Sequence, residues 1–351
     1  MLTKLPIFEV LDELVEKLVS DKRAVLSAPP GAGKSTAIPI SLTKNPAFSN
    51  GKIIVLEPRR LAVKQVASRM AQTLGEPLGK TVGYRIRGES KCDEQTKVEV
   101  VTEGILIRMI QEDQQLTGIS TVIFDEFHER SLNADLGLAF CLEIASVLRE
   151  DLKILVMSAT LEISAVSKLM QDAPIISCEG KSFHVKPRWQ AKPVAQDQIV
   201  GKLITDVILQ AFNENKGSLL VFLPGEAEII KLASTLKNKV PGNCHVFPLY
   251  GRLEFKDQQK AIKPILEGRK IVLATNVAET SLTIEGIDTV IDSGLSKRSI
   301  YDANSGMDRL VTQKISKAEA RQRMGRAGRL NPGVCYKLWS KTQDGSFTDF
   351  C

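Results

Sequence analysis

The chain has 351 residues, which is too long for one ordinary domain and enough for about two domains that each bury a core of their own. Apolar residues make up 43% and charged residues 25%, a balance that excludes a disordered or fibrous protein, and no apolar run reaches the roughly 20 residues that a membrane-spanning helix requires. The formal charge of +6 favours a polyanionic partner only mildly, because a solvated basic surface explains it as well.

The six cysteines are scattered along the chain, with no closely spaced pair and no histidine at metal-ligand spacing. Zinc sites and disulfide frameworks are recognised by such paired spacings, so the pattern indicates reduced cysteines. Residues 1–22 alternate acidic and apolar positions with helical periodicity, which is not typical of a secretory signal. We therefore expect a cytoplasmic protein.

The first half of the chain alternates short apolar strands with helical segments. Strands are predicted at residues 24–27, 52–56, 98–101, 121–124 and 153–157. Helical periodicity is clearest at 61–74 and 132–148. Strands that are apolar throughout and separated by helices indicate a parallel sheet that is covered on both faces.

The same pattern begins again in the second half. Strands are predicted at residues 218–223, 246–249, 271–274, 289–292 and 334–338. The intervening segment 180–198 has little periodicity, and we expect the domain junction there. The predicted architecture is α/β with two domains, 1–180 and 181–351, and a ligand cleft between them, with the functional motifs at the carboxyl ends of strands.

A phosphate-binding loop is predicted at residues 28–36, where a strand ends and a helix begins. Glycines let backbone N–H groups approach phosphate oxygens, Lys34 would reach the β- and γ-phosphates, and the Ser35 hydroxyl would bind Mg²⁺. Ala28 stands where the usual pattern has glycine, and a plain turn is the alternative. The predicted nucleotide-binding residues are Pro30, Gly31, Ala32, Gly33, Lys34, Ser35 and Thr36.

Two acids, Asp125 and Glu126, follow the strand at 121–124. Asp125 would hold Mg²⁺ through its water shell, and Glu126 would orient and deprotonate the attacking water. A solvated strand end is the alternative reading of two adjacent acids, but a phosphate-binding loop in the same domain favours the catalytic one. The metal site is predicted at Ser35, Asp125 and Glu126.

His128 is the one histidine of three for which we predict a catalytic role, because it closely follows the acids. Residues 158–160, Ser-Ala-Thr, also end a strand and could couple the acids to the second domain. The other two histidines are assigned to packing or to the surface.

The second half carries a basic motif at residues 322–329. Arg326 and Arg329 are spaced by one helical turn, so we expect both to project from one helix face and act as arginine fingers on a γ-phosphate. Gln322, four residues before Arg326, could position the attacking water. An exposed basic helix that binds RNA nonspecifically is the alternative.

The order of the motifs resembles that of the DEAH-box helicases of superfamily 2, and most closely that of the bacterial HrpB-type members. The resemblance rests on residues 57–60, 102–104, 125–128, 158–160, 223–225, 275–283 and 322–329. It implies two tandem RecA-like domains with a nucleotide cleft, the use of ATP or other nucleoside triphosphates with Mg²⁺, and 3′-to-5′ movement along a single strand, usually RNA.

The same resemblance assigns residues to the nucleic acid and to the nucleotide. The strand would be held by Arg59, Arg60, Thr102, Glu103, Thr275, Asn276 and Thr280, which suit phosphate and sugar contacts rather than base reading. Arg69 would stack on one side of the adenine, and Ile262 stands where relatives place an aromatic residue. Ser281 and Glu285 belong to the implied nucleotide site, with Glu285 where many relatives have aspartate.

The resemblance also implies a strand-separating β-hairpin at residues 297–311. The chain ends about twenty residues after Arg329, where relatives continue into further domains, so we expect a truncated core. We expect a monomer with RNA, or else DNA, as its partner, and an unidentified protein could stimulate it. Alternatives are a DNA-directed translocase, a P-loop kinase, which would need an acceptor site, and a non-unwinding nucleic-acid clamp, against which the intact Glu126 counts.

Overall fold

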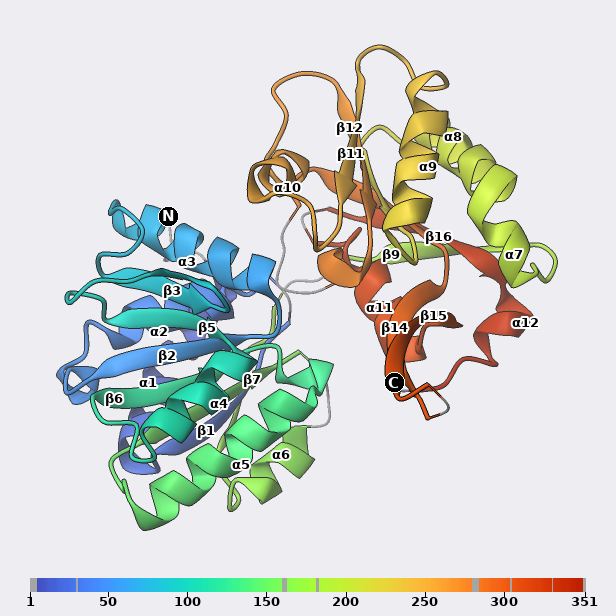
Figure 1. Cartoon of the computed structure of the whole chain (residues 1–351). Helices are drawn as coiled ribbons and strands as arrows, with labels where there is room; N and C mark the ends of the chain where they lie inside the picture. The colour runs from blue at the N-terminus through green and yellow to red at the C-terminus, as the bar shows by residue number, and fades with distance from the viewer. Residues whose placement is uncertain are drawn as a thin grey trace. The chain divides into compact units, whose positions relative to one another are not determined.

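The structure is a computed structural model that describes residues 5–29, 31–159, 163–180, 183–279, 284–303, 305–329 and 331–349. The chain divides into two compact units, Met1–Lys181 and Ser182–Cys351. Each unit has its own sheet (Figure 1).

The first unit is built on an eight-stranded sheet with the order β4-β3-β5-β2-β6-β7-β1-β8. Neighbouring strands are parallel except for the antiparallel pair β3 and β4. The strands are β1 (Arg23–Ser27), β2 (Lys52–Glu57), β3 (Val82–Ile86), β4 (Glu89–Lys91), β5 (Val98–Thr102), β6 (Ile119–Phe124), β7 (Lys153–Ser158) and β8 (Ile175–Ser177). All five predicted strands are present, and the three that were not predicted lie towards the sheet edges.

Helices cover both faces of this sheet (Figure 1). On β2, Ile53 and Val55 pack under α1, α2 and α3, whereas Ile54 and Leu56 pack under α4, α5 and α6. Because successive side chains point to opposite faces, a strand covered on both sides is apolar at every position. The helical segments are η2 (Pro6–Glu9), α1 (Leu11–Ser20), α2 (Lys34–Leu42), η3 (Pro46–Phe48), α3 (Arg60–Leu74), α4 (Glu103–Glu112), η4 (Phe127–Glu129), α5 (Leu132–Val147) and α6 (Ile163–Leu169).

The second unit is built on a six-stranded parallel sheet with the order β11-β12-β10-β13-β16-β9. Its strands are β9 (Val185–Gln190), β10 (Ser218–Phe222), β11 (Cys244–Leu249), β12 (Arg269–Ala274), β13 (Ile287–Asp292) and β16 (Gly333–Ser340). Strand β9 lies inside segment 180–198, which has little periodicity and where we predicted the domain junction. It is an edge strand whose side chains are partly or fully exposed, so it lacks the apolar run by which the other strands were found.

Helices α8 and α9 pack on one face of the second sheet. An antiparallel hairpin of β14 (Leu295–Asp302) and β15 (Met307–Lys314) forms a separate two-stranded sheet, in the segment where a hairpin was implied. The helical segments are α7 (Gln196–Gln198), η5 (Ile199–Leu203), α8 (Ile204–Glu214), α9 (Glu226–Lys237), α10 (Phe255–Ile262), η6 (Asn276–Ala278), α11 (Lys317–Gly325) and α12 (Lys341–Asp344).

The end of α11 corrects one prediction. The helix stops at Gly325, Arg326 forms its C-cap, and Arg329 lies beyond it. Glycine is a weak helix former, and glycines at 325 and 328 end the helix before the second arginine. The expectation that Arg326 and Arg329 project from one helix face is therefore wrong.

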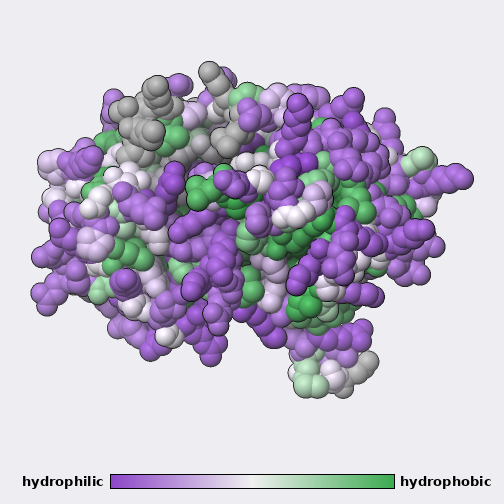
Figure 2. Space-filling view, turned by 90° about the horizontal axis from the view of Figure 1, so that it is seen from above, coloured by the Kyte–Doolittle hydropathy of each residue, from purple (hydrophilic) through white to green (hydrophobic). Residues whose placement is uncertain are grey.

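The face drawn in Figure 2 is predominantly hydrophilic, with smaller hydrophobic areas between the hydrophilic residues. Among the helices of the described residues, none combines the length and the apolar character needed to cross a membrane.

Candidate active site

The loop between β1 and α2 has the backbone that a phosphate cradle requires. Gly31 has φ 88° and Gly33 has φ 95°, left-handed values that side-chain-bearing residues rarely adopt. A Cβ on Gly33 would also lie 2.7 Å from Leu5 Cδ1. Of the residues predicted here, Pro30 lies outside the described residues, as do Thr160, Thr280 and Ser281 elsewhere in the chain.

Lys34, the first residue of α2, is buried between the two predicted acids. Its Nζ donates a hydrogen bond to Glu126 Oε1 at 3.1 Å and lies 3.8 Å from Asp125 Oδ1. Burial by itself lowers the pKa of Lys34, but the charges of Glu126 and Asp125 outweigh it, so this pKa is raised. The side chain is therefore a fixed cation in the loop.

Asp125 has the features of a cation ligand. Its Oδ1 accepts the Glu126 backbone N–H at 2.7 Å, whereas its buried Oδ2 accepts no hydrogen bond from the described residues. Burial raises the pKa of Asp125, opposed by Lys34, and the Ser35 hydroxyl also acts to lower it. The Asp125 carboxylate, with one buried oxygen that accepts no hydrogen bond within the described chain, and the Ser35 hydroxyl that acts on the same carboxylate are the hard oxygen ligands that Mg²⁺ prefers.

Mg²⁺ bound to a nucleotide takes few ligands from the protein, because phosphates and water supply the rest. No cluster of three or more His, Cys, Asp or Glu side chains that could hold a metal occurs in the part of the chain that the structure describes. Ser35 and Asp125 are the oxygen donors that would fit Mg²⁺ bound with a nucleotide.

His128 connects the acids to the end of β7. Its Nε2 lies 3.4 Å from Glu126 Oε2, and its Nδ1 accepts the Ala159 backbone N–H at 3.3 Å. Burial lowers the pKa of His128, which favours the neutral ring. Since Nδ1 accepts a hydrogen bond, the proton lies on Nε2 and points to Glu126.

The residues predicted to hold nucleic acid in the first unit lie at the carboxyl ends of β2 and β5. Arg59 donates to Glu129 Oε2 from Nη2 at 3.0 Å and from Nε at 3.3 Å. Glu103 begins α4 and accepts a hydrogen bond from the Ser131 hydroxyl. Burial raises the pKa of Glu103.

A groove of about 880 Å³ opens beside these residues. Of the predicted residues, Arg60, Thr102 and Glu103 line it. Its lining also includes three arginines that we did not predict from the sequence, which are Arg85, Arg87 and Arg108. Arg85 is paired with the buried Glu99 at 2.7 Å. The groove therefore gathers guanidinium groups at the carboxyl end of the sheet.

In the second unit, the arginine motif is organised by a residue that we did not predict. Arg323 on α11 is fully buried and pairs with Glu279 at 2.5 Å and with Asp292 at 2.9 Å. Its Nη1 also donates to the Leu295 carbonyl at 3.2 Å. Arg326 donates from Nε to the Glu279 carbonyl at 2.7 Å. Glu279 thus connects the two arginines.

The other predicted residues of the second unit lie at element ends. Thr275 and Asn276 follow β12, Gln322 is half-buried on α11, and Glu285 is exposed. Ile262, which stands where relatives place an aromatic residue, is the last residue of α10. Arg69, predicted to stack on the adenine, is exposed on α3 of the first unit.

The end of α10 is held by a buried lysine. Lys270 Nζ donates to the carbonyls of Ala261, Ile262 and Lys263 at 3.1, 3.3 and 2.9 Å. Cations stabilise the carboxyl ends of helices in this way. The position of Ile262 therefore depends on Lys270.

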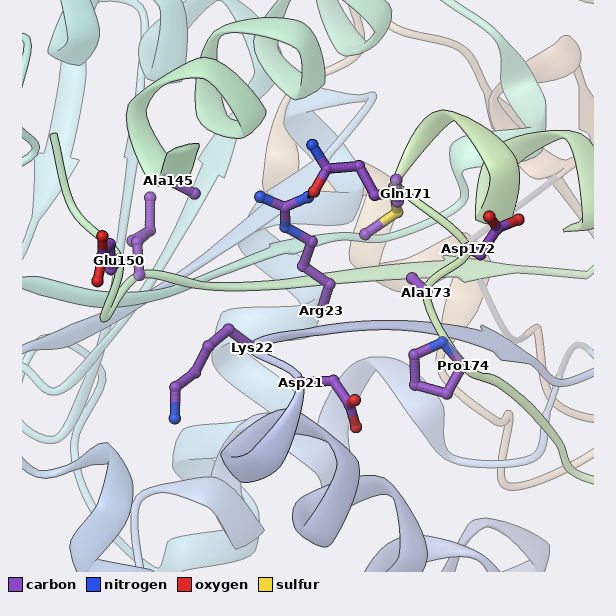
Figure 3. Close-up of a pocket in the computed structure, with 11 residues that line it drawn as sticks. Asp21, Lys22, Arg23, Ala145, Glu150, Gln171, Asp172, Ala173 and Pro174 are labelled. Atoms are coloured by element: carbon purple, nitrogen blue, oxygen red, sulfur yellow. Dashed lines mark hydrogen bonds between the residues drawn. The ribbon is translucent and has the colours of Figure 1, made fainter. Parts of the chain in front are cut away.

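A second hollow, of about 300 Å³, lies at the amino ends of β1, β7 and β8 (Figure 3). Arg23 donates a hydrogen bond to Gln171 within it. Because the phosphate loop follows the carboxyl end of β1, this hollow is at the opposite end of the sheet from the candidate site.

Known protein families match most of the chain. Residues 9–169 match the DEAD/DEAH box helicase family, and residues 200–331 match the helicase conserved C-terminal domain. The chain is 47% identical to the ATP-dependent RNA helicase HrpB of Escherichia coli over 97% of its length and 42% of that protein. It is 38% identical to the HrpA homolog of Haemophilus influenzae over 96% of its length and 26% of that protein.

Solved structures agree with these matches. A crystal structure of the E. coli DEAH/RHA helicase HrpB superposes with a TM-score of 0.91 at 45% identity, covering 99% of this chain and 44% of that one. A crystal structure described as the E. coli DExH-box NTPase HrpB gives a TM-score of 0.84 at 45% identity over 99% and 43% of the two chains. The chain therefore spans less than half the length of these relatives.

Proposed function

The chain belongs to the DEAD/DEAH box helicase family, with two tandem RecA-like domains, and on that premise we propose that it is the motor part of an ATP-dependent RNA helicase. In this proposal it hydrolyses Mg²⁺-ATP, or other nucleoside triphosphates, and moves 3′-to-5′ along single-stranded RNA. It would act as a monomer in the cytoplasm. The observation that carries the proposal is the buried arrangement of Lys34 against Glu126 and Asp125 behind a left-handed glycine loop.

The nucleotide chemistry is assigned to the first unit. Lys34 would neutralise the β- and γ-phosphates, exchanging its contact with Glu126 for phosphate oxygens. Glu126 would then be available to take a proton from the attacking water, while His128 keeps it oriented. Ser35 and Asp125 would hold Mg²⁺, which when bound withdraws charge from the phosphate oxygens.

The second unit would supply the arginines. In the state described, the Glu279 carbonyl accepts hydrogen bonds from Arg326, so Arg326 has to leave it to reach a phosphate. Arg329 and Gln322 are proposed to act with it, as an arginine finger and a water-positioning group. Buried Arg323 would fix the position of Glu279 during this exchange.

The groove at the carboxyl end of the first sheet is proposed to hold the nucleic-acid backbone. Arg60, Arg87 and Arg108 line it, and guanidinium groups bind phosphate without reading bases. Thr275, Asn276 and Thr280 are proposed to hold the same strand from the second unit. The preference for RNA over DNA follows the names of the relatives, because phosphate contacts do not distinguish the two.

Steady-state ATP hydrolysis tests the proposal. The chain would be assayed alone, with poly-U RNA and with single-stranded DNA, beside its Glu126→Gln variant, which keeps the size of the side chain and removes the base. We expect RNA to raise a turnover that Glu126→Gln abolishes. Equal turnover in the variant would sink the catalytic assignment. Stimulation by DNA alone would make the chain a DNA-directed translocase.

A further inference from the structure

One short turn connects the catalytic acids to a residue assigned to nucleic acid. The turn η4 begins directly after Glu126 and ends at Glu129. Glu129 accepts two hydrogen bonds from Arg59, which is the N-cap of α3. The two side chains are only 16% and 22% exposed, so this ion pair is largely shielded from water.

This turn is strained at both ends. Glu126 has φ 51° and Arg130 has φ 49°, left-handed values that are uncommon and unfavourable for residues other than glycine. Such a backbone persists only where its surroundings hold it. Two of the contacts that hold it are the Ala159 N–H on His128 and the Arg59 guanidinium on Glu129. The Arg59 pair is therefore one of the contacts that hold the turn directly after the acids.

While this ion pair exists, Glu129 occupies N–H groups of the Arg59 guanidinium that a phosphate would otherwise bind. Glu129 contacts its guanidinium, and Glu103 is close enough for their charges to interact. A phosphate that approaches Arg59 meets the Glu129 carboxylate on the same guanidinium and is repelled by it. Phosphate and Glu129 are therefore alternative partners for the same cation.

We propose that Glu129 and a backbone phosphate of the nucleic acid compete for Arg59, and that this exchange releases the acid turn. Glu129 is then a positioning residue that restrains hydrolysis until nucleic acid binds. The inference rests on the proposed function, because it assumes that the chain hydrolyses ATP and binds RNA. The proposed exchange explains how a phosphate bound at the carboxyl end of β2 can affect Glu126, which follows the carboxyl end of β6.

The test compares Glu129→Gln, Arg59→Ala and the double variant with the wild-type chain. RNA-free ATP hydrolysis is measured together with the affinity for a fluorescently labelled poly-U strand at fixed salt. Both single variants should raise RNA-free hydrolysis by about threefold, the range that one partly exposed ion pair supports. The double variant should raise it no further, because both substitutions remove the same contact.

The effects on RNA affinity should have opposite signs. Glu129→Gln removes the competitor and should tighten RNA binding by about threefold, whereas Arg59→Ala removes the phosphate partner and should weaken it. The matched control is Asp151→Asn. Asp151 pairs with Arg149 at 2.7 Å just before β7, at the opposite end of the sheet from the turn, so this variant loses the same charge without losing the Arg59 contact. It should leave RNA-free hydrolysis at the wild-type rate.

Two results would overturn the inference. If Glu129→Gln weakens RNA binding as Arg59→Ala does, Glu129 merely supports Arg59. If neither variant raises RNA-free hydrolysis, the pair does not restrain the acids. Thermal unfolding checks that the variants fold. If Glu129→Gln does not fold, Glu129→Asp replaces it, because the shorter side chain keeps the charge but withdraws it from Arg59. The effect of RNA on ATP hydrolysis by the wild-type chain is measured first. Wild-type hydrolysis that RNA does not change would instead refute the proposed function.

Discussion

At the scale of single residues, the nucleotide site depends most directly on Lys34. Its ammonium group donates a hydrogen bond to the buried Glu126 carboxylate at 3.1 Å and lies 3.8 Å from Asp125 Oδ1. Lys34→Ala should reduce ATP hydrolysis by about 100-fold or more, because it removes the charge that would meet the phosphates. Steady-state phosphate release measures this.

The control for Lys34→Ala is Lys44→Ala. Lys44 is exposed just after the end of α2, so its removal changes the net charge equally but leaves the loop intact. Wild-type turnover is expected in the control. Turnover near the wild-type rate in Lys34→Ala itself would contradict the assignment of the loop.

The lowered pKa of His128 predicts that the stability of the folded protein depends on pH. Burial lowers its pKa, so between that value and about 6.5 the unfolded chain binds a proton that the folded chain does not. Stability therefore rises with pH in this range and is lost as the pH falls below about 6.5. His128→Gln should flatten the decrease in Tm between pH 7.5 and pH 5.5. Identical slopes in the two proteins would show that His128 takes up its proton as readily in the folded state.

At the scale of secondary-structure elements, α11 is anchored by the buried Arg323. Removing one partner of a buried ion pair leaves uncompensated charge, so Arg323→Met should lower the free energy of unfolding by about 3–5 kcal/mol. Urea denaturation measures the loss. Arg321→Met, an exposed arginine on the same helix, should cost far less. Equal stability of both variants would show that Glu279 and Asp292 do not need this cation.

The elements that the sequence predicted are those with a strong apolar period. Strands such as β2 and β6 are covered on both faces and therefore read as continuous apolar runs. Edge strands β4 and β9 were not predicted, because their side chains are partly or fully exposed and no hydrophobic periodicity distinguishes them from loops. The end of α11 was placed wrongly because the spacing of Arg326 and Arg329 was read as helical across Gly328.

The residues of the candidate site could be predicted from the sequence where they lie together in one short motif. The glycine loop and the acids each belong to a motif that follows a strand, and parallel pairing brings both to one end of the sheet. Arg323 was not predictable, because several arginines lie within a few residues and only the fold determines which is buried. The groove residue Arg108 was missed for a related reason, since helix spacing alone does not show what an exposed arginine faces.

At the scale of the whole molecule, the net charge of +6 is modest, so binding to nucleic acid should depend on where cations gather. Arg60 and Arg108 line the groove. If each meets one phosphate, replacing both with alanine should reduce the slope of log K against log salt by about 1.4, at about 0.7 per phosphate on a single strand. Fluorescence anisotropy across a salt series measures the slope.

A double variant of Lys44 and Lys80 to alanine is the control for this experiment. Both lysines are exposed, and neither is among the residues that line the groove within the described chain. Their removal should leave the slope unchanged. A similar reduction in both double variants would mean that the whole surface, rather than the groove, attracts the strand.

The short strand β4 has a further consequence for how molecules of this protein meet one another. Its three residues, Glu89, Ser90 and Lys91, are all exposed, and they form the outer border of the eight-stranded sheet. The unpaired backbone groups of an edge strand can hydrogen-bond to a strand of another chain. A strand this short and charged, however, offers few backbone groups and places an ammonium group at the point of contact. Such a border disfavours growth of the sheet from one molecule into the next, so concentrated solutions should resist fibrillar aggregation through this side.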